Sequence, residues 1–479
     1  MNTDHATIEL DHDEEIEQRF VFEGKQKTTL LAFIVLGIVC LVATFFIDNT
    51  RFWTNYLHNA VFFLGMSFVA TFVLSAFMLA YAGWHVVMKR VWEAFMLFLP
   101  IGLIMMLAVI VGLWMHGHHL YHWSMDGIAD PTSPNYDRIL AGKVPFLNKY
   151  WYTFGTLIIV SVWTFFAFKL RSLSLKEDEE GTRDYKLHQQ MKKVAAIFLP
   201  IGAFTSAALI WQWVMSIDGH WYSTLYAWYA TASWFVAMLA LTILILIYLK
   251  SKGYYKTVTA EHLHDLGKYM FAFSVFWTYL WFSQFMLIWY GNNGEETVYY
   301  NTRRHEYTIL YFGNLVLNFV LPFLILMRND TKRKYGSLGF TAVLVFFGHW
   351  WDYFYLIKPG ARINAEHAHH GGGHGAEAGH GAADAHGHGA DAAHGAADAA
   401  HGAAGHAAEH GGDLAHAAGH AAEHGAEFAM GFTIPGLLEI GTFLGFLAFF
   451  LYFVFSRLEK AALIPKNDPY LEESLHHHV

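Results

Sequence analysis

The sequence is poor in cysteine and in charge. Of its 479 residues only Cys40 is a cysteine, and 15% are charged, against roughly a quarter in an average soluble domain. One thiol excludes an intrachain disulfide, a CxxCH haem attachment and a cysteine-ligated iron–sulfur cluster. The low charge argues against a soluble enzyme or a disordered chain, and the net charge of −9 gives nucleic-acid phosphates no broad attraction. Any electron-transfer metal must therefore lie on histidines or on a partner subunit.

Apolar residues are abundant and gathered into long runs. Hydrophobic residues make up 55% of the chain, aromatic residues 17%, and the mean hydropathy is +0.28. A helix needs roughly 20 such residues to cross the hydrocarbon of a bilayer, and the strand-like alternation of a membrane barrel is missing. We therefore predict an all-α integral membrane protein with ten transmembrane helices. The runs cover residues 28–47, 56–84, 92–114, 150–170, 193–215, 225–249, 267–290, 306–327, 337–357 and 433–456.

The distribution of Lys and Arg predicts the orientation. Of the 31 such residues, 23 fall in segments on the side of the N-terminus and 8 on the other side. Because cytoplasmic segments carry the excess of positive charge, we expect both termini in the cytoplasm. The predicted division is a cytoplasmic tail over 1–27, spans one to nine over 28–357, an outer loop over 358–432, span ten over 433–456 and a cytoplasmic tail over 457–479.

The outer loop contains a low-complexity segment. Residues 361–427 are almost entirely Ala, Gly, His, Asp and Glu, and 14 of the 31 histidines lie between His367 and His424. Neutral imidazole binds zinc, copper and nickel, so one interpretation is a metal-collecting loop. The other is a soluble spacer, which the composition also fits. We favour the spacer, because the irregular histidine spacings suit no fixed tetrahedral site.

A five-residue motif occurs twice in the predicted spans. Phe-Leu-Pro-Ile-Gly stands at 98–102 and again at 198–202, and a proline within a span bends the helix and frees a carbonyl. Each copy leads to a polar cluster at the outer surface. The first cluster is His116, His118, His119, His122 and Asp126, and the second is Gln212, Asp218, His220, Trp221 and Ser223. Such groups suit a quinone site, because His and Asp can hydrogen-bond the headgroup oxygens and take up the protons that quinol releases on oxidation. They equally suit the exit of a proton path. They also suit side chains in water beyond the helix ends.

Further polar residues fall inside the spans, where burial is costly and usually functional. We expect His349 and Asp352, three residues apart on one helical face, to pair. No two histidines show a recognisable spacing for a b-type haem, and no metal ligand is predicted. The intramembrane set is His58, Asn59, His85, Glu93, Gln284, Asn314, Asn318, His349, Asp352 and Glu439.

These residues define two candidate proton routes. The first enters from the cytoplasm at His85 and Glu93 and leaves by Asp218, with a hydrated gap at the bends of Pro100 and Pro200. Protons need ionisable groups or water along their way, because hydrocarbon offers no acceptor. The alternative route passes through Gln284, Asn314 and Asn318.

Several longer motifs resemble one family of membrane proteins. The sequence HDLGK at 264–268 leads into FWTYLWFSQFMLIWY at 276–290 and EET at 295–297, and MSIDGHWYST precedes it at 215–224. Together with PKNDP at 465–469, these motifs resemble the ActF subunits of bacterial alternative complex III, which are NrfD/PsrC-like proteins. The resemblance covers nearly all ten spans and omits the N-terminal tail and the His-rich loop. It departs at Gly294, where we expect Pro, and at 148–151, where we expect an Asn-Pro-Phe-like entry.

The resemblance implies a fold of two four-helix bundles, spans 2–5 and spans 6–9, flanked by spans 1 and 10. It implies a multi-pass subunit, in the bacterial inner (plasma) membrane, of a complex that oxidises quinol and passes electrons to cytochrome c or another acceptor. This chain would supply a scaffold, a proton pathway and a quinone pocket in the first bundle, with quinol or menaquinol as its only ligand besides lipids. The c haems and iron–sulfur clusters would lie on partners: a second NrfD-like subunit, an iron–sulfur protein, and multihaem and monohaem c-type cytochromes. A terminal oxidase would be a further partner.

The alternative function is a divalent-metal transporter with the His-rich loop as its collector. Such transporters need carboxylate–His pairs deep in two spans, whereas the HxxxD motif from His122 to Asp126 falls outside span three. The runs also lack an inverted repeat of broken, glycine-rich helices. We therefore favour the respiratory subunit.

The spacer interpretation predicts that the His-rich loop is dispensable. Replacing residues 366–425 by a short Gly/Ser bridge should leave assembly and quinol oxidation intact, because this composition builds no core. Copurification of partner subunits and the rate of quinol oxidation measure the outcome. Loss of assembly would instead make the loop a docking element.

Overall fold

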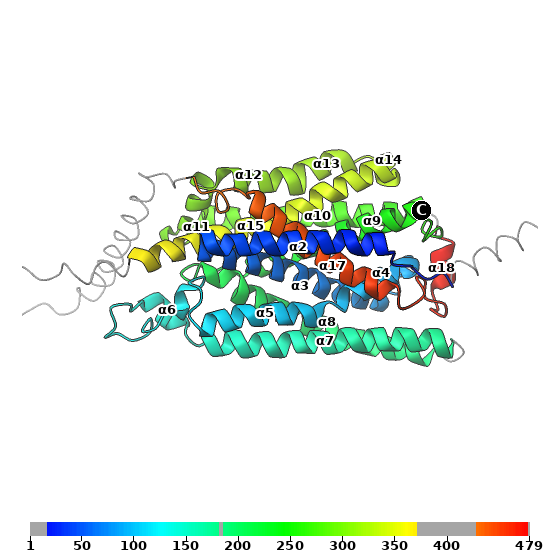
Figure 1. Ribbon diagram of the computed structural model, residues 1–479, viewed down its shortest axis with the longest axis horizontal. Coiled ribbons are helices and arrows are strands. Elements are labelled where there is room, and N and C mark those ends of the chain that lie inside the picture. Colours follow the sequence, from blue (N-terminus) through cyan, green and yellow to red (C-terminus); the bar gives the residue numbers. More distant parts are fainter. Residues whose placement is uncertain (1–16, 182–184, 371–427, 478–479) are drawn as a thin grey trace, which may run out of the picture.

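The computed structural model describes residues 17–181, 185–370 and 428–477. Apart from two isolated bridges, every element there is helical, and the long helices lie side by side along the longest axis (Figure 1). The all-α prediction is thereby confirmed, and nine helical segments of the described chain are long and apolar enough to cross a membrane, which agrees with a multi-pass membrane protein. They are Gly24–Ile47 (α2), Asn49–Leu79 (α3), Val86–Trp114 (η1, α4, α5), Lys149–Glu180 (α7), Lys186–Ile217 (α8, η3), Leu225–Ser251 (α9), Ala260–Gly291 (α10), Thr308–Leu326 (α12, η4, α13) and Leu437–Leu458 (α17).

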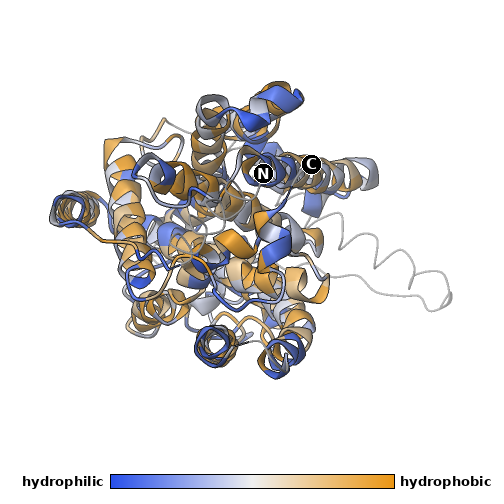
Figure 2. Ribbon diagram, turned by 90° about the vertical axis from the view of Figure 1, so that its right-hand side faces the viewer, coloured by the Kyte–Doolittle hydropathy of each residue, from blue (hydrophilic) through white to orange (hydrophobic). Residues whose placement is uncertain are grey.

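Short helices mark the two ends of the molecule. The helices α6 (Arg138–Lys143) and α11 (Gly294–His305) lie at one end, called here the α6 end (Figure 1). The helices α14 (Asn329–Arg333) and α18 (Leu471–Leu475) lie at the other, the α18 end. Viewed from the α18 end, Figure 2 shows apolar residues throughout the long helices.

The helix α15 (Tyr335–His370) contains the predicted span 337–357 but is not among the nine apolar segments. It is nevertheless central, since it packs against α3, α9, α12 and α13. Its hydropathy is reduced by polar residues that are fully buried, among them His349, Asp352 and Lys358. A helix with several buried polar side chains therefore occupies the middle of the bundle.

The same helix extends beyond its predicted boundary. We placed the outer loop from residue 358 onward, but α15 continues to His370. The amide of Asn364 explains part of this extension, because its Nδ2 donates to the carbonyls of Leu120 (2.7 Å) and Ile217 (2.8 Å). The extension is thus fixed to two segments at the α6 end, the loop that follows α5 and the turn that follows α8.

The packing separates two groups of four. The helices α3, α4–α5, α7 and α8 pack together, as do α9, α10, α12–α13 and α15, and the groups meet along α3 and α9. Gly65 permits this approach, because a Cβ at that position would lie 1.8 Å from the indole of Trp234. The helices α2 and α17 pack against each other and against α3.

The repeated Phe-Leu-Pro-Ile-Gly motif takes two different backbone forms. Around Pro100 the span is broken, with α4 ending at Met96 and α5 beginning at Leu99, and a proline is well tolerated in such a first turn. Pro200 lies inside α8 (Lys186–Trp213), which runs on without interruption. Sequence identity therefore does not make the two bends equivalent.

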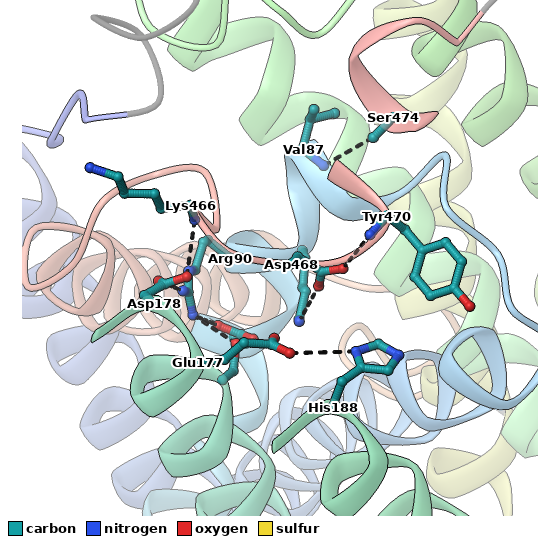
Figure 3. A network of polar contacts seen from close by, with 12 residues as sticks. Val87, Arg90, Glu177, Asp178, His188, Lys466, Asp468, Tyr470 and Ser474 are labelled. Atoms are coloured by element: carbon teal, nitrogen blue, oxygen red, sulfur yellow. Dashed lines mark hydrogen bonds and ion pairs between the residues drawn. The ribbon is translucent and has the colours of Figure 1, made fainter. Parts of the chain in front are cut away.

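The C-terminal segment closes the α18 end. The hydroxyl of Ser474 donates to the carbonyl of Trp84 (2.8 Å) and accepts from the amide of Val87 (3.2 Å). Lys89 Nζ lies 2.7 Å from a carboxylate oxygen of Asp468, with both side chains buried (Figure 3). The turn between α3 and α4 is thereby tied to residues from the far end of the sequence.

A second set of contacts joins this segment to α7. Asp178 pairs with Arg90 and accepts a hydrogen bond from the backbone amide of Lys466 at 3.0 Å (Figure 3). Asn467 Nδ2 adds a bond of 2.8 Å to the carbonyl of Asp178. The buried ion pairs of the α18 end are thus completed by residues 466–468.

Asp468→Asn should destabilise the chain at neutral pH. Burial alone would raise the pKa of the Asp468 carboxyl, but the charge of Lys89 lowers it below its usual value. A lowered pKa stabilises the folded chain above the unfolded value of about 3.9, and that stabilisation is lost as pH falls. Removing the carboxylate leaves Lys89 buried without it, at a cost of about 3–5 kcal/mol.

Thermal unfolding in detergent measures this effect. The gap between wild type and variant should be large at neutral pH and shrink below about pH 4. Glu472→Gln, which changes a side chain that is 85% exposed, serves as the control. Equal unfolding temperatures of the Asp468 and Glu472 variants at neutral pH would contradict the prediction.

Candidate functional site

A buried polar cluster lies in the second group of helices and is centred on Asp352. The carboxylate accepts hydrogen bonds from the hydroxyl of Tyr229, from Asn314 Nδ2 (2.6 Å) and from Trp277 Nε1 (3.0 Å). These donors come from α9, α12 and α10, so the carboxyl group holds three helices to α15. All four side chains are buried.

The backbone changes its winding next to this cluster. Asn318 lies in η4 (Val316–Val320), a single π-helical turn, and its Nδ2 donates to Asn314 Oδ1 (2.6 Å) and to the carbonyl of Gly348 (2.9 Å). Pro322 has no N–H for the carbonyl of residue 318, which favours the wider turn. Such single turns are frequent at functional sites.

His349 lies one turn before Asp352 on α15. Its Nδ1 is 2.9 Å from the hydroxyl of Ser233, and its Nε2 has no hydrogen-bond partner in the described chain. We expected His349 and Asp352 to pair, but in the described chain they make no direct ion pair and instead share Ser233 of α9, which contacts both side chains. Their i, i+3 spacing thus serves contacts between helices.

The donors around Asp352 are all neutral. In the described ranges, no Lys, Arg or His nitrogen comes within 4.0 Å of its carboxylate. A buried ionised carboxylate without a cation is costly, even where hydrogen bonds compensate in part. The arrangement therefore suits a carboxyl group that binds and releases a proton.

An ion pair and a column of aromatic rings lead from Asp352 toward the α6 end. Arg303 of α11 pairs with Asp218 at 2.7 Å, and its guanidinium lies 3.5 Å above the ring of Tyr299. Burial alone would lower the pKa of Arg303, but the charge of Asp218 raises it well above the usual value. Tyr299 stacks on Trp221 at 3.8 Å, and the ring of Tyr226 lies between Trp221 (5.7 Å) and Tyr229 (6.3 Å).

Most of the outer candidates of the first bundle lie at the surface. His116 and Asp126 are 3.7 Å apart with side chains 54% and 82% exposed, and His119 is exposed. The ring of His122 lies 5.8 Å from that of His220, whose Nε2 is 2.5 Å from Asp137. Burial would raise the pKa of Asp137, but the hydrogen bond from His220 helps lower it to about 2. This surface position agrees with the interpretation of side chains in water.

Two outer candidates are buried instead. Gln212 Nε2 donates to the carbonyl of Phe146 at 2.6 Å, while its Oε1 has no partner in the described chain. His118 Nε2 lies 3.1 Å from the carbonyl of Val109, and burial lowers its pKa to about 4. Nearby, a cavity of about 350 Å³ is lined mainly by apolar side chains, among them Phe146, Trp211 and Trp221.

At the predicted entry of the first route, Glu93 and His85 are not free to exchange protons as we expected. Glu93 is buried and pairs with both Arg90 and Arg171, and two guanidiniums favour a permanently ionised carboxylate. The ring of His85 stacks on Trp92 at 5.7 Å, and burial lowers the pKa of His85 to about 4. These contacts argue against Glu93 as a proton carrier and so weaken the first-bundle route.

The cluster thus brings together Asn314, Asn318 and Asp352, and places His349 beside them. Gln284 is buried on α10, and its Nε2 has no partner within the described residues. The sequence reasoning missed Tyr229, Trp277 and Arg303. Arg303 looked like a solvated loop charge, and Tyr229 and Trp277 looked like two of many aromatic residues within their spans.

No metal site is found in the part of the chain that the structure describes, where no three His, Cys, Asp or Glu side chains are close enough to hold an ion. The histidines at 374–424 lie outside the described residues. Comparison with family models and with curated proteins gives no match.

Asp218→Asn should lower stability. The side chain of Arg303 is 1% exposed, and without its carboxylate it would be a buried unpaired charge, which costs about 3–5 kcal/mol. The matched control is Asp126→Asn, because the Asp126 side chain is 82% exposed. Thermal unfolding of the purified chain compares the two variants, and equal unfolding temperatures would show that the Asp218–Arg303 pair is not structural.

Proposed function

We propose that this chain is a membrane subunit of a bacterial respiratory quinol:electron-acceptor oxidoreductase, of the ActF type found in alternative complex III. In this proposal it carries no redox centre and contributes a scaffold and a transmembrane proton pathway. The observation that carries the proton pathway is the Asp352 carboxyl group, buried among neutral donors from three helices. The motifs at 215–224, 264–290 and 465–469 support the family.

The proposed topology has ten crossings. The tenth crossing, beside the nine apolar segments, is α15, whose 36 residues exceed the roughly 20 that a bilayer requires. Its polar residues face other helices, which is where such residues are tolerated in membranes. The 23 of 31 Lys and Arg on the N-terminal side favour a cytoplasmic α18 end with both termini inside the bacterial plasma membrane.

The proposed proton route runs through the second bundle. At the α6 end it passes beside the fixed Asp218–Arg303 pair and follows Tyr226 and Tyr229 to Asp352. From Asp352 it continues to Asn314 and Asn318. The hydrogen bonds from Tyr229 to Asn318 form a continuous chain of neutral donors, whereas the chain at Glu93 consists of fixed ion pairs.

The proposed quinol site lies in the first bundle at the α6 end. The cavity of about 350 Å³ beside Phe146, Trp211 and Trp221 has a largely apolar lining, as ligand pockets for apolar molecules do. The buried indole N–H groups of Trp211 and Trp221 have no partner within the described residues, so they are candidates to bind quinol oxygens. Electrons would pass to haems and iron–sulfur clusters on partner subunits.

Copurification tests the class of function. The tagged full-length chain, extracted from its native membrane in mild detergent, should bring c-type haem absorbance, iron–sulfur protein and quinol oxidation with it. The alternative, a divalent-metal transporter, predicts instead that the chain alone moves zinc into vesicles. A chain that carries no haem protein and transports zinc would overturn the respiratory proposal.

Asp352→Asn tests the pathway. The substitution preserves size and removes the exchangeable proton, and a positioned proton donor is typically worth about 10²–10⁴-fold in rate. We expect an assembled complex in vesicles whose proton translocation is lost, whereas Asp330→Asn, a change at a side chain 65% exposed, should behave as wild type. Unchanged proton translocation in the Asp352 variant would remove the second-bundle route.

A further inference from the structure

The face of α15 that contacts α3 carries a buried lysine. Lys358 is fully buried, and its Nζ lies 2.7 Å from Thr54 Oγ1 and 2.6 Å from Asn55 Oδ1, both on α3. The aromatic rings of Phe354 and Phe432 lie 5.4 Å and 5.0 Å from the nitrogen. In the described ranges no carboxylate oxygen lies within 4.0 Å of it. A buried amine without a counter-ion is unusual enough to require an explanation.

Both oxygen partners act as acceptors. The hydroxyl hydrogen of Thr54 is donated to the carbonyls of Thr50 (2.8 Å) and Arg51 (3.0 Å), and Asn55 donates its Nδ2 to Glu439 at 2.9 Å. Two acceptors match the two hydrogens of a neutral amine, whereas an ammonium group has three to place. The other neighbours are the two aromatic rings, which would give an ammonium group cation–π contacts in place of a third hydrogen bond.

The neighbouring charges are already balanced. Arg51 holds Glu439 through two hydrogen bonds of 2.7 Å and 2.8 Å, and the backbone amide of Gly436 adds a third at 2.9 Å. A proton on Lys358 therefore gives this group of side chains a net positive charge. The other titratable groups nearby are Asp48 at the start of α3 and His58, whose Nε2 lies 2.9 Å from the carbonyl of Trp350.

We propose that Lys358 is a second proton-binding site of this protein, on a different face of α15 from Asp352. The amine takes up a proton to become an ammonium group and releases it again, and no other bond changes. The proton is released to water at the α6 end beside the Arg51–Glu439 pair, where the Arg51 side chain is 12% exposed and the pair keeps its own charges. This inference deepens the proposed function, because it places proton release to the outside at Lys358.

The first test needs no partner subunit. Thermal unfolding of the full-length chain in detergent is followed between about pH 7 and pH 10 for wild type, Lys358→Met and Lys252→Met, which removes an exposed lysine. The unfolded chain binds a proton at Lys358 below about pH 10.4, and the folded chain holds the neutral amine. Wild type should therefore lose stability relative to Lys358→Met as pH falls, while Lys252→Met follows wild type.

The second test uses the assembled complex in vesicles. Lys358→Met cannot bind the proton and Lys358→Arg cannot release it, so both variants should lose proton translocation with assembly retained. A pH-independent gap in unfolding temperature, or wild-type translocation in both variants, would overturn the proposal. If Asp352→Asn also leaves translocation unchanged, the proposed pathway fails as a whole. If Asp352→Asn abolishes proton translocation and the two Lys358 variants do not, only the proposal for Lys358 is overturned.

Discussion

The constraint that shapes this protein is the cost of a polar group without a partner in hydrocarbon. A bilayer core offers no water, so each buried donor and acceptor must be satisfied by the protein itself. The helix α15 meets this demand by occupying the centre, where α9, α10 and α12 surround one face and α3 and α17 another. Asp352 on the first face and Lys358 on the second are possible only because other helices cover them.

The same constraint explains how the ends of the bundle are built. Ionised side chains at the α18 end occur as linked pairs, from Arg171 through Glu93 and Arg90 to Asp178. At the α6 end, Arg303 and Asp218 form one such pair, and Arg51 and Glu439 another. In the middle, by contrast, the donors to Asp352 are neutral. Fixed charge is thus kept at the ends, and the interior retains groups that can change their charge.

Hydropathy predicted the helical fold well, but it did not predict which buried polar side chains bind one another. A run of apolar residues is a local property, so each of the ten predicted spans overlaps a long helix or a run of consecutive helices, although 56–84 and 433–456 include residues outside α3 and α17. Intramembrane polar residues could also be predicted as important, because their burial is costly wherever it occurs. The hydrogen-bond partner of a buried side chain depends on packing between helices that are distant in the sequence. Tyr229 and Asp352, for example, are 123 residues apart.

The errors have related physical causes. The paired motifs around Pro100 and Pro200 suggested equivalent bends, but the helix breaks at one and continues at the other although the five residues are identical, so the surroundings of the motif decide the outcome. Lys358 entered the sequence reasoning only as a charge beyond the end of a span. A helix that continues to His370, held by Asn364, places that lysine inside the packed bundle.

The closure of the α18 end by the C-terminal segment has a consequence for biosynthesis. Lys89 and Asp178 find their partners 379 and 288 residues later in the chain. Until residues 466–468 leave the ribosome, Lys89 lacks the Asp468 carboxylate, and Asp178, already paired with Arg90, lacks the hydrogen bond from the Lys466 amide, so that end of the bundle is not complete during translation. A chain truncated before residue 466 would therefore contain every long helix of the described structure and still leave Lys89 buried without its carboxylate, so the latest contacts to form complete some of the earliest helices.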